Sequence, residues 1–548
     1  MYFTLAVGAA TAARCAALAG AARQADPRIM PVPGPAEVAW RSPDGRAAVL
    51  CWPGGMTPRN PPRREGLHPA ESAWRSHAGT IWAEGAAVCA RTGLARVDPV
   101  YVAEVPGGVV VSDRACWAAA VTGGLGDYDP AMAGALLSLG YPVGGVTPFR
   151  GVRALGAGRR LRVTGGRSVI TPAGEAAGGR AADPAPVAAA LTGAVAPLAH
   201  AAAPVELSLT GGKDSRLIAA ALTAAGVPFL ARTHGAAGHP DVVIAGMIAG
   251  RLGVPHTVTE PRAPGTPDEA DMLGRLRSAV LVSDGMLSAF ENLGSGARPG
   301  SPPAAGPVQA GGHGGELLRG GYAQAAWRGA TPLSAVAAAE LFRRMTTRRL
   351  SLLRPDAAAA YLASLAPWRA ALARGPLAAL DDFYLANRAG RWSATARQAY
   401  LLRSPLAQPF FADPVIRAAR GVPLRRRMTD RLHRDVLAAL CPELADLPLA
   451  GSPWHGEPCT PATVLAVPPG PASADWRRNY AEPTARFLRG YVLDHGDTSP
   501  MFGIVRRRAA ERSLGFPPAD PHAVWALATL AALLSGDWRI QAISRMFS

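Results

Sequence analysis

The chain has 548 residues, of which 49% are hydrophobic and 18% are charged, so it can bury sizeable cores and is not disordered as a whole. At about 100–200 residues per domain, this length predicts two to four domains. The net charge is +17, but the arginines that carry it are scattered, and the only lysine is Lys213. A dedicated nucleic-acid-binding protein usually clusters its basic residues, so no nucleic-acid partner is expected.

The first 172 residues are predicted to form an α+β domain. Short apolar runs alternate with turns that contain Gly, Pro or Asp, as is typical of strands, and two longer stretches favour helices. The Gly-, Ala- and Pro-rich segment 173–186 then predicts a linker. The strands are expected at 47–52, 100–103 and 108–112, and the helices near 69–90 and 116–125.

Residues 187–548 are predicted to begin with a parallel sheet and to end in a large helical region. Strand, turn, helix and strand follow one another at the spacing of βαβ units. Two Pro- and Gly-rich breaks, 294–308 and 448–474, are predicted to be loops. The strands are expected at 205–209, 229–233 and 254–258, and the helices at 187–200, 215–225 and 241–252.

The patterns of cysteine and hydrophobicity indicate a cytoplasmic protein. Six cysteines are too few for a disulfide scaffold and none forms a C-x-x-C pair, so reduced thiols and no zinc site are expected. The Ala-rich segment 5–22 has no basic residue before it and is interrupted by Arg14, which argues against an export signal. The apolar run 523–535 is too short to cross a membrane and predicts a core helix, so no membrane partner is expected.

The segment 206–216, ELSLTGGKDSR, combines the end of a strand, two glycines and the start of a helix. Gly211 and Gly212 let the backbone approach a ligand closely, and the helix N-terminus offers unpaired N–H groups to a phosphate. Asp214 beside phosphates implies a bridging divalent cation, so Mg²⁺ is expected. The segment is not a Walker A loop, because Leu207 stands at the first glycine position of that motif and Asp214 follows the lysine.

The segment 210–215, TGGKDS, resembles the pyrophosphatase loop S-G-G-x-D-S of the asparagine synthetase family, with Thr in place of the first Ser. Three later segments match the family in the same order, so the resemblance covers about residues 200–450. It implies an N-terminal sandwich of the Ntn-like glutaminase type, followed by an α/β pyrophosphatase-loop (HUP-like) synthetase domain. It also implies that ATP adenylates a carboxylate and that pyrophosphate leaves. The three segments are 238–256, 312–322 (GHGGELLRGGY) and 382–406.

The resemblance also implies roles for single residues. Glu316 takes the place of the family's metal-binding Asp, so Asp214 and Glu316 are expected to hold Mg²⁺, unless Glu316 is a solvated loop acid. His313 is a candidate to take a proton from an attacking amine, its alternative being a loop histidine without that role. Arg434 is expected to face the adenylate, or else is a surface arginine. The implied ATP-binding residues are Ser208, Thr210, Gly211, Gly212, Lys213, Asp214, Ser215 and Thr233.

The N-terminal domain is expected to be an inactive glutaminase scaffold. Glutamine-dependent members of the family use a cysteine at position 2, where this chain has Tyr2, and Cys15 lies too far along to replace it. The attacking nucleophile is therefore expected to come from a source other than glutamine. The family's second late lysine also has no counterpart in segment 447–451, which leaves open how collapse of the adenylate is assisted.

Within the family, segments 207–217, 283–292 and 312–317 look most like the lasso peptide cyclases. That resemblance implies adenylation of an Asp or Glu side chain of a precursor peptide, followed by attack of the peptide's own N-terminal amine. The implied partners are the core peptide, a leader-binding protein and a leader peptidase. The alternatives are an ammonia-dependent asparagine synthetase, a β-lactam synthetase and a catalytically dead peptide-binding scaffold.

Overall fold

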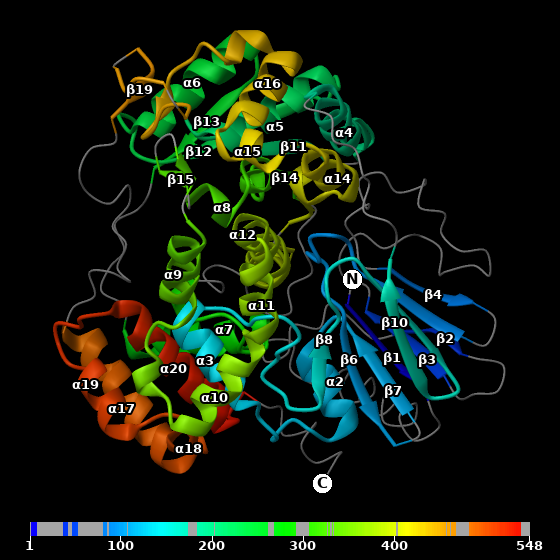
Figure 1. Ribbon diagram of the computed structural model, residues 1–548, viewed down its shortest axis with the longest axis vertical. Helices are drawn as coiled ribbons and strands as arrows, with labels where there is room; N and C mark the ends of the chain where they lie inside the picture. Colours follow the sequence, from blue (N-terminus) through cyan, green and yellow to red (C-terminus); the bar gives the residue numbers. More distant parts are fainter. Residues whose placement is uncertain are drawn as a thin grey trace.

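The computed structural model shows a mixed α/β protein with two large antiparallel sheets, a five-stranded parallel sheet and many helices. Figure 1 shows the antiparallel sheets on one side, the parallel sheet at one end and a helical region at the other end. Side chains are described from residue 87 onward, apart from 88, 327, 328, 331, 332 and 401. The structure describes residues 2–7, 37–41, 47–52, 80–84, 87–106, 108–173, 183–201, 203–260, 268–291, 306–325, 327–328, 331–332, 334–401, 404–455, 457–460, 462–466 and 482–538.

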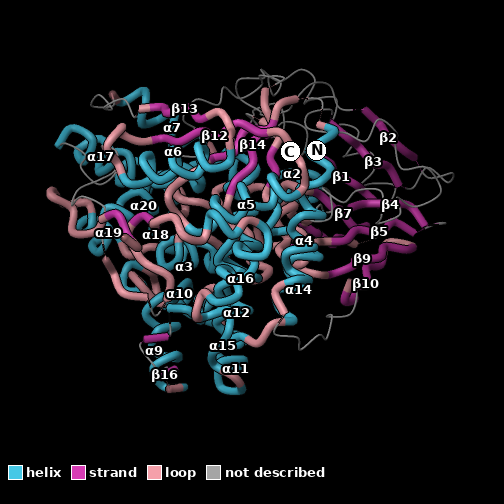
Figure 2. Tube along the Cα trace, turned by 90° about the horizontal axis from the view of Figure 1, so that it is seen from above, coloured by secondary structure: helices cyan, strands magenta, loops and turns pink. Residues whose placement is uncertain are grey.

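The N-terminal region is built from two antiparallel sheets, which Figure 2 shows side by side at one edge of the molecule. The predicted strands at 47–52 and 108–112 are confirmed, and the one predicted at 100–103 runs from Tyr101 to Val105. One sheet has the order β2 (Glu37–Arg41), β3 (Ala47–Trp52), β1 (Tyr2–Val7), β7 (Gly108–Ser112), β6 (Tyr101–Val105) and β8 (Val152–Ala154). The other has the order β10 (Arg167–Pro172), β9 (Arg159–Thr164), β5 (Ala87–Arg91) and β4 (Thr80–Glu84).

Alternating side chains hold these two sheets together. In β9, Leu161 and Val163 are buried while the intervening Arg162 is exposed. The two buried residues share a cluster with Val109 of β7, as expected for the inner faces of a sandwich. Val110 points to the opposite face and packs with α2 (Ala115–Thr122), which confirms the helix predicted near 116–125.

The helix predicted near 69–90 is wrong in its described part. Residues 80–84 and 87–91 form β4 and β5, which pair as an antiparallel hairpin, and β5 also pairs with β9. Alanines in this stretch favour a helix, but pairing with neighbouring strands overrides local propensity. The rest of the predicted helix, from 69 to 79, lies outside the described residues.

The parallel sheet predicted after the linker is confirmed, with the order β13-β12-β11-β14-β17 and parallel neighbours throughout. The chain adds β12 and β13 on one side of β11, then reverses and adds β14 and β17 on the other side. The carboxyl ends of β11 and β14 therefore flank the switch point at which such sheets bind ligands. The strands are β11 (Val205–Ser208), β12 (Phe229–His234), β13 (His256–Thr259), β14 (Val308–Gly311) and β17 (Leu406–Ala407).

Helices flank the parallel sheet close to the predicted places. The helix predicted at 215–225 is α5 (Lys213–Ala224), and the one predicted at 241–252 is α6 (Pro240–Leu252). The helix predicted at 187–200 is divided into α4 (Ala185–Val195) and the 3₁₀ helix η3 (Ala196–His200). Most of the predicted linker, residues 174–182, lies outside the described residues, as do residues 294–305 of the first predicted loop.

The C-terminal region is helical, as predicted, and its central element is α20 (Pro521–Ser535). Residues 523–534 of α20 are all buried, which confirms the predicted core helix. None of the helices in the described ranges combines the length and apolar character needed to cross a bilayer. The other helices are α3 (Pro130–Leu139), α7 (Glu269–Ser283), η4 (Ala289–Glu291), η5 (Gly315–Arg319), α8 (Tyr322–Ala325), α9 (Ala335–Thr346), η6 (Leu350–Leu352), α10 (Pro355–Ser364), α11 (Ala366–Arg374), α12 (Pro376–Phe383), the π-helix η7 (Tyr384–Ser393), α13 (Ala394–Leu401), η8 (Pro409–Phe411), α14 (Asp413–Gly421), α15 (Leu424–Met428), α16 (Arg431–Leu440), η9 (Pro442–Leu444), α17 (Glu482–Thr498), α18 (Met501–Ile504) and α19 (Arg507–Ser513).

The antiparallel region and the helical region share one hydrophobic core. Phe149 of the first and Trp525 of the second belong to the same buried cluster. The Tyr128 hydroxyl donates a hydrogen bond to the Leu533 carbonyl over 2.6 Å. The two regions are therefore parts of one packed body.

A buried ion pair also joins these regions. Asp284, in the left-handed conformation at the end of α7, pairs with Arg114. Its second carboxylate oxygen accepts the backbone N–H groups of Ala115 and Cys116, at 2.8 and 3.3 Å. Asp284 thus caps α2, a helix that lies about 170 residues earlier in the chain.

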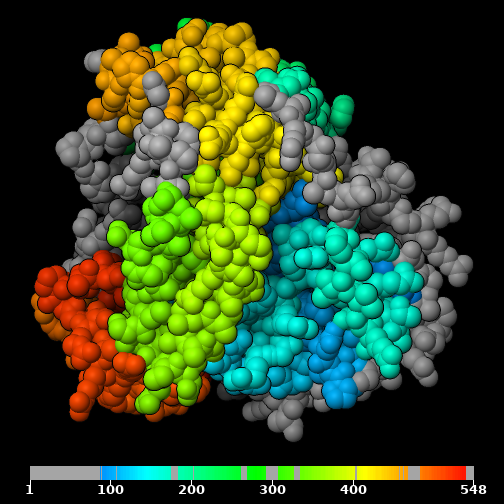
Figure 3. All heavy atoms as spheres, viewed as in Figure 1, coloured from blue at the N-terminus to red at the C-terminus, as the bar shows by residue number. Residues whose placement is uncertain are grey.

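The π-helix η7 contacts the antiparallel region along one side. The Asn387 amide oxygen accepts the Gly144 N–H over 2.8 Å, and Arg391 donates to the carbonyls of Gly144 and Val146. Figure 3 shows the chain around residues 360–400 as a column between the parallel-sheet end and the helical end. This column is therefore connected to all three parts of the molecule.

Candidate functional site

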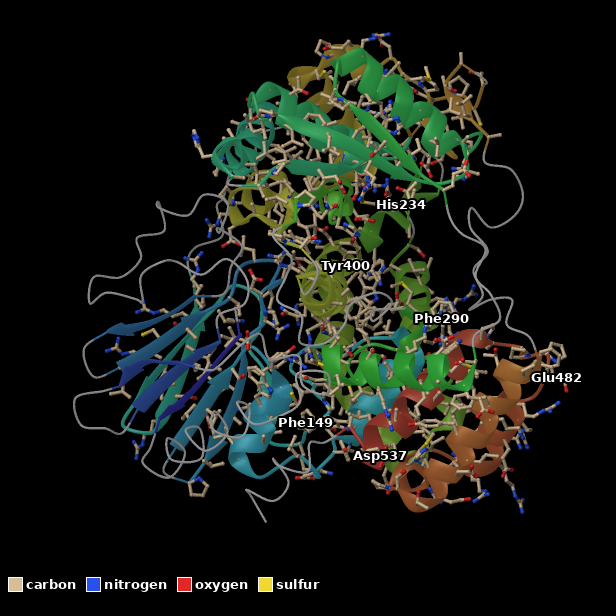
Figure 4. The ribbon with its side chains drawn as sticks, turned by 180° about the vertical axis from the view of Figure 1, so that it is seen from behind. Phe149, His234, Phe290, Tyr400, Glu482 and Asp537 are labelled. Carbon is tan, nitrogen blue, oxygen red and sulfur yellow. The ribbon has the colours of Figure 1, made fainter. Side chains whose placement is uncertain are left out.

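The candidate site lies at the carboxyl ends of the parallel strands. Figure 4 shows His234, the last residue of β12, on the side of the sheet that faces the rest of the molecule, with Tyr400 of α13 below it. The loops that follow β11 and β14 start at this same edge, because parallel strands end together. These loops carry the two glycine-rich motifs, 210–215 and 312–315.

The turn after β11 is held by its own hydroxyl groups. The Thr210 N–H donates to the Ser215 hydroxyl over 3.1 Å, and the two hydroxyl oxygens are 3.0 Å apart. The Gly212 N–H donates to Thr210 Oγ1 over 3.2 Å. No side chain caps α5 at Gly212, so the first N–H groups of this helix are not used by a capping side chain and point toward the edge of the sheet.

The neighbouring segments fix this turn from both sides. The Gly211 N–H donates to Asp241 of α6 over 2.9 Å, and its carbonyl accepts the N–H of Ala450 over 3.1 Å. Arg216, buried in α5, donates to the carbonyls of Leu444 and Leu447 and so holds the segment that leads to Ala450. This segment continues into a short parallel ladder, β18 (Leu449–Ala450) with β19 (Val464–Leu465), inside the predicted loop 448–474.

The second glycine motif packs directly on the first. A Cβ atom on Gly312 would lie 2.6 Å from the Ser215 backbone nitrogen, and one on Gly315 would lie 2.3 Å from Asp214 Oδ1. Any side chain at either position would collide with the start of α5. The structure thus brings together two motifs that are about 100 residues apart in the sequence.

Charged side chains link these two motifs with α16. Lys213 donates to Asp430 over 2.6 Å and to the Pro453 carbonyl over 2.9 Å, and its ammonium lies 5.1 Å from the centre of the Trp454 ring. Arg319 donates to Asp214 over 2.8 Å. Two cations and two carboxylates therefore lie together at the N-terminus of α5.

The protein environment changes the pKa values of both carboxyl groups. Burial raises the pKa of Asp214, although Arg319 opposes this shift through its charge and its hydrogen bond. Burial also acts to raise the pKa of Asp430, but Lys213 and Arg319 outweigh it, and the pKa of Asp430 is lowered. The same cluster of charges therefore shifts the pKa values of Asp214 and Asp430 in opposite directions.

His433 of α16 also contacts Lys213 and Asp214 at this helix N-terminus. Its Nε2 lies 3.2 Å from the Lys213 carbonyl and 3.6 Å from Asp214 Oδ1, and the side chain is fully buried. Burial, reinforced by the positive charge of Arg319, lowers the pKa of His433 to about 3. The imidazole is therefore neutral at pH 7 and fixes the first turn of α5 without adding charge.

His313 lies on the open side of the second motif. Its ring is exposed to solvent and its centre is 6.3 Å from that of Tyr400. Partial desolvation lowers the pKa of His313, although the nearby Glu316 and Asp214 oppose this. The imidazole is thus neutral at pH 7, which is the state that accepts a proton. Burial and the interaction with Glu316 raise the pKa of Tyr384.

The remaining predicted site residues occupy several environments. Ser208 and Thr210 are exposed at the end of β11. Thr233 is buried, and its hydroxyl lies 2.9 Å from both the Leu209 carbonyl and His256 Nε2, so it joins two strand ends. Arg434 is half-exposed and forms an ion pair with Glu457.

At the expected magnesium site, one carboxylate oxygen is free of protein hydrogen bonds. Asp214 Oδ1 is buried without a hydrogen-bond partner, so this oxygen is available to a cation. Glu316 lies on the same loop as Gly315, which packs on Asp214. Within the described ranges, no group of three His, Cys, Asp or Glu side chains gathers to hold a metal. The residues therefore fit an ion such as Mg²⁺, which takes one or two protein carboxylates and completes its shell with phosphate oxygens and water.

Sequence reasoning missed four residues of this network: Arg319, Gln324, Asp430 and His433. Arg319 and Gln324 lie within or just after the second glycine motif, where an arginine three residues after Glu316 is the signal that could have been noticed. Gln324 donates to Asp430 over 2.6 Å. Asp430 and His433 lie more than 200 residues from Lys213, and only the folded chain brings them to it.

Comparison with known proteins adds no further constraint. A scan against protein-family models and a search of curated proteins found no match to this chain.

Proposed function

We propose that this chain is an ATP-dependent, AMP-forming amide ligase, and specifically a lasso peptide cyclase. The observation that carries the proposal is the pair of glycine-rich loops packed together at the switch point of the parallel sheet, with Lys213 and Arg319 beside them. Such a helix N-terminus suits a pyrophosphate group. The sequence resemblance to lasso peptide cyclases supplies the finer assignment.

The proposed reaction has two steps. A side-chain carboxylate of the peptide forms a bond to the α-phosphorus of ATP, and the bond to pyrophosphate breaks. The N-terminal amine of the same peptide then attacks the acyl carbon, AMP leaves, and the amine gives up one proton. The first N–H groups of α5 would bind the departing pyrophosphate, and His313, neutral at pH 7, would accept the proton.

Magnesium has a defined place in this proposal. Asp214, through its unpartnered oxygen, and Glu316 would hold the ion. When bound, Mg²⁺ would neutralise negative charge on the triphosphate.

Pyrophosphate exchange tests the proposal. Purified protein is incubated with ATP, labelled pyrophosphate and a synthetic peptide that has a free N-terminal glycine and an Asp or Glu seven to nine residues in. We expect peptide-dependent exchange of label into ATP, release of AMP, and a product lighter than the peptide by one water. Asp214→Ala should abolish all three, whereas Asp127→Ala, which removes an exposed aspartate paired with Arg150, should change none of them. Release of ADP and orthophosphate would contradict the proposal.

A further inference from the structure

We infer that Arg319, rather than Lys213, is the cation that binds the pyrophosphate group of the nucleotide. This inference rests on the proposed function and adds to it a residue to which neither the sequence motif nor the resemblance assigned a role. The two cations stand at the same helix end, so the question is which of them has hydrogen-bond donors free for an anion.

Lys213 is already committed to protein partners. Its ammonium group has three donors, of which two are used at 2.6 and 2.9 Å on Asp430 and Pro453. The face of Trp454 lies 5.1 Å away and adds a cation–π contact. Moving Lys213 toward a ligand would remove the ammonium partner of Asp430, a largely buried carboxylate that would then keep the hydrogen bond from Gln324.

Arg319 has N–H donors that protein groups do not use. Of its five donors, one makes a short bond to Asp214, and Nη1 reaches Gln324 only at 3.5 Å. Its Nε is buried without a partner. The side chain still keeps 17% of its surface exposed to solvent.

The position of Arg319 also suits a phosphate. Its partner Asp214 belongs to the first turn of α5, so the guanidinium lies beside the N–H groups of that turn. A planar guanidinium offers two parallel N–H groups to two phosphate oxygens, which an ammonium does not. Asp214 orients the guanidinium through the hydrogen bond from Arg319 Nη2, and the N–H groups that Asp214 does not use would bind the anion.

Binding of inorganic pyrophosphate and ATP, measured by titration calorimetry without peptide, tests the inference. We expect Arg319→Gln to weaken pyrophosphate binding about tenfold to a hundredfold, since it removes hydrogen bonds between charged groups. Arg319→Lys should weaken it less, and adenosine binding should not change. Arg349→Gln is the matched control, because Arg349 is 18% exposed and pairs with Asp520 at a different place in the fold.

The outcomes separate this inference from the proposed function. If wild type binds pyrophosphate and Arg319→Gln binds it equally well while Lys213→Gln does not, Lys213 is the binding cation and the inference is wrong. If wild type itself binds neither ATP nor pyrophosphate, the proposed function fails, and the inference with it. If Arg319→Gln and Arg319→Lys have equal melting temperatures, a difference in their pyrophosphate affinity is a property of the site. If only Arg319→Gln has a lowered melting temperature, the titration of Arg319→Lys alone decides. Wild-type affinity of Arg319→Lys for pyrophosphate would then overturn the inference.

Discussion

At the scale of single residues, the candidate site depends on the absence of side chains at two glycines. Gly312 and Gly315 let the second loop lie against the first turn of α5, within the distance at which any Cβ atom would collide with it. This contact holds Asp214, Arg319 and His313 in one small region. The glycines therefore determine the geometry of the charged groups.

Gly312→Ala tests this role. The new methyl group would lie 2.6 Å from a backbone nitrogen of α5, so the loop must move, and overpacking of this kind costs about 1–3 kcal/mol. We expect a loss of at least tenfold in ATP-dependent activity and a lower melting temperature. Gly274→Ala is the control, since a Cβ atom there meets nothing within 4 Å in helix α7, and it should be neutral or slightly stabilising. Wild-type activity in Gly312→Ala would contradict the close packing.

His433 predicts a dependence of stability on pH. Its pKa is about 3 in the folded protein, against an ordinary value of 6.5, so the unfolded chain binds the proton more readily between these values. The stability that neutral His433 contributes is therefore complete above pH 6.5 and is lost as the pH falls toward 3, by up to about 1.4 kcal/mol per pH unit.

Urea denaturation at pH 7.0, 6.0 and 5.0 measures this effect. The wild type should lose stability more steeply than His433→Gln, in which position 433 no longer titrates. If the free energy of unfolding falls equally with pH in the two proteins, the folded state does not lower the pKa of His433, and the prediction is wrong.

At the scale of secondary-structure elements, Asp284 connects α7 with α2. It accepts two N–H groups at the start of α2 and pairs with Arg114, all within the interior. We expect Asp284→Ala to destabilise the protein by about 3–5 kcal/mol, because it leaves the Arg114 guanidinium buried without this partner.

A second substitution separates charge from backbone conformation at this site. Asp284 has a φ of 54°, which asparagine tolerates better than alanine, so Asp284→Asn should lose only the part of the stability that comes from the charge. Denaturant midpoints of the two variants give the comparison. Equal losses would mean that backbone conformation contributes nothing here.

The sequence predicted elements best where neighbouring residues decide them. The strand, glycine turn and helix around Gly211, and the apolar helix ending at Ser535, were predicted because periodicity and turn residues are local signals. The hairpin of β4 and β5 was mistaken for a helix, because the pairing of β5 with β9 depends on residues about 70 positions away. The network of Asp430 and His433 could not be predicted for the same reason.

At the scale of the whole molecule, the shared hydrophobic core predicts that the two halves of the chain depend on each other. Phe149 and Trp525 lie in one cluster, although they belong to the first and last parts of the sequence. A fragment of residues 183–548 would expose the face that Phe149 covers. We expect it to aggregate or to melt without a cooperative transition in calorimetry.

The matched control keeps both halves present. A protease site placed between residues 173 and 183 allows the chain to be cut after folding, and the two pieces should then elute together in gel filtration. A monomeric 183–548 fragment that melts at the temperature of the intact protein would contradict this prediction.

The π-helix η7 has a consequence for how the parts of this molecule communicate. Asn387 and Arg391 of this helix form hydrogen bonds with Gly144. Tyr384, the first residue of the helix, lies next to Glu316. Insertion of extra residues into a helical turn is often found at functional sites, where it widens and rotates the turn. A rotation of this one element would shift the loop of the antiparallel sandwich and the carboxylate of the glycine-rich loop at the same moment. The sandwich and the glycine-rich loop at the parallel sheet thus contact the same short element.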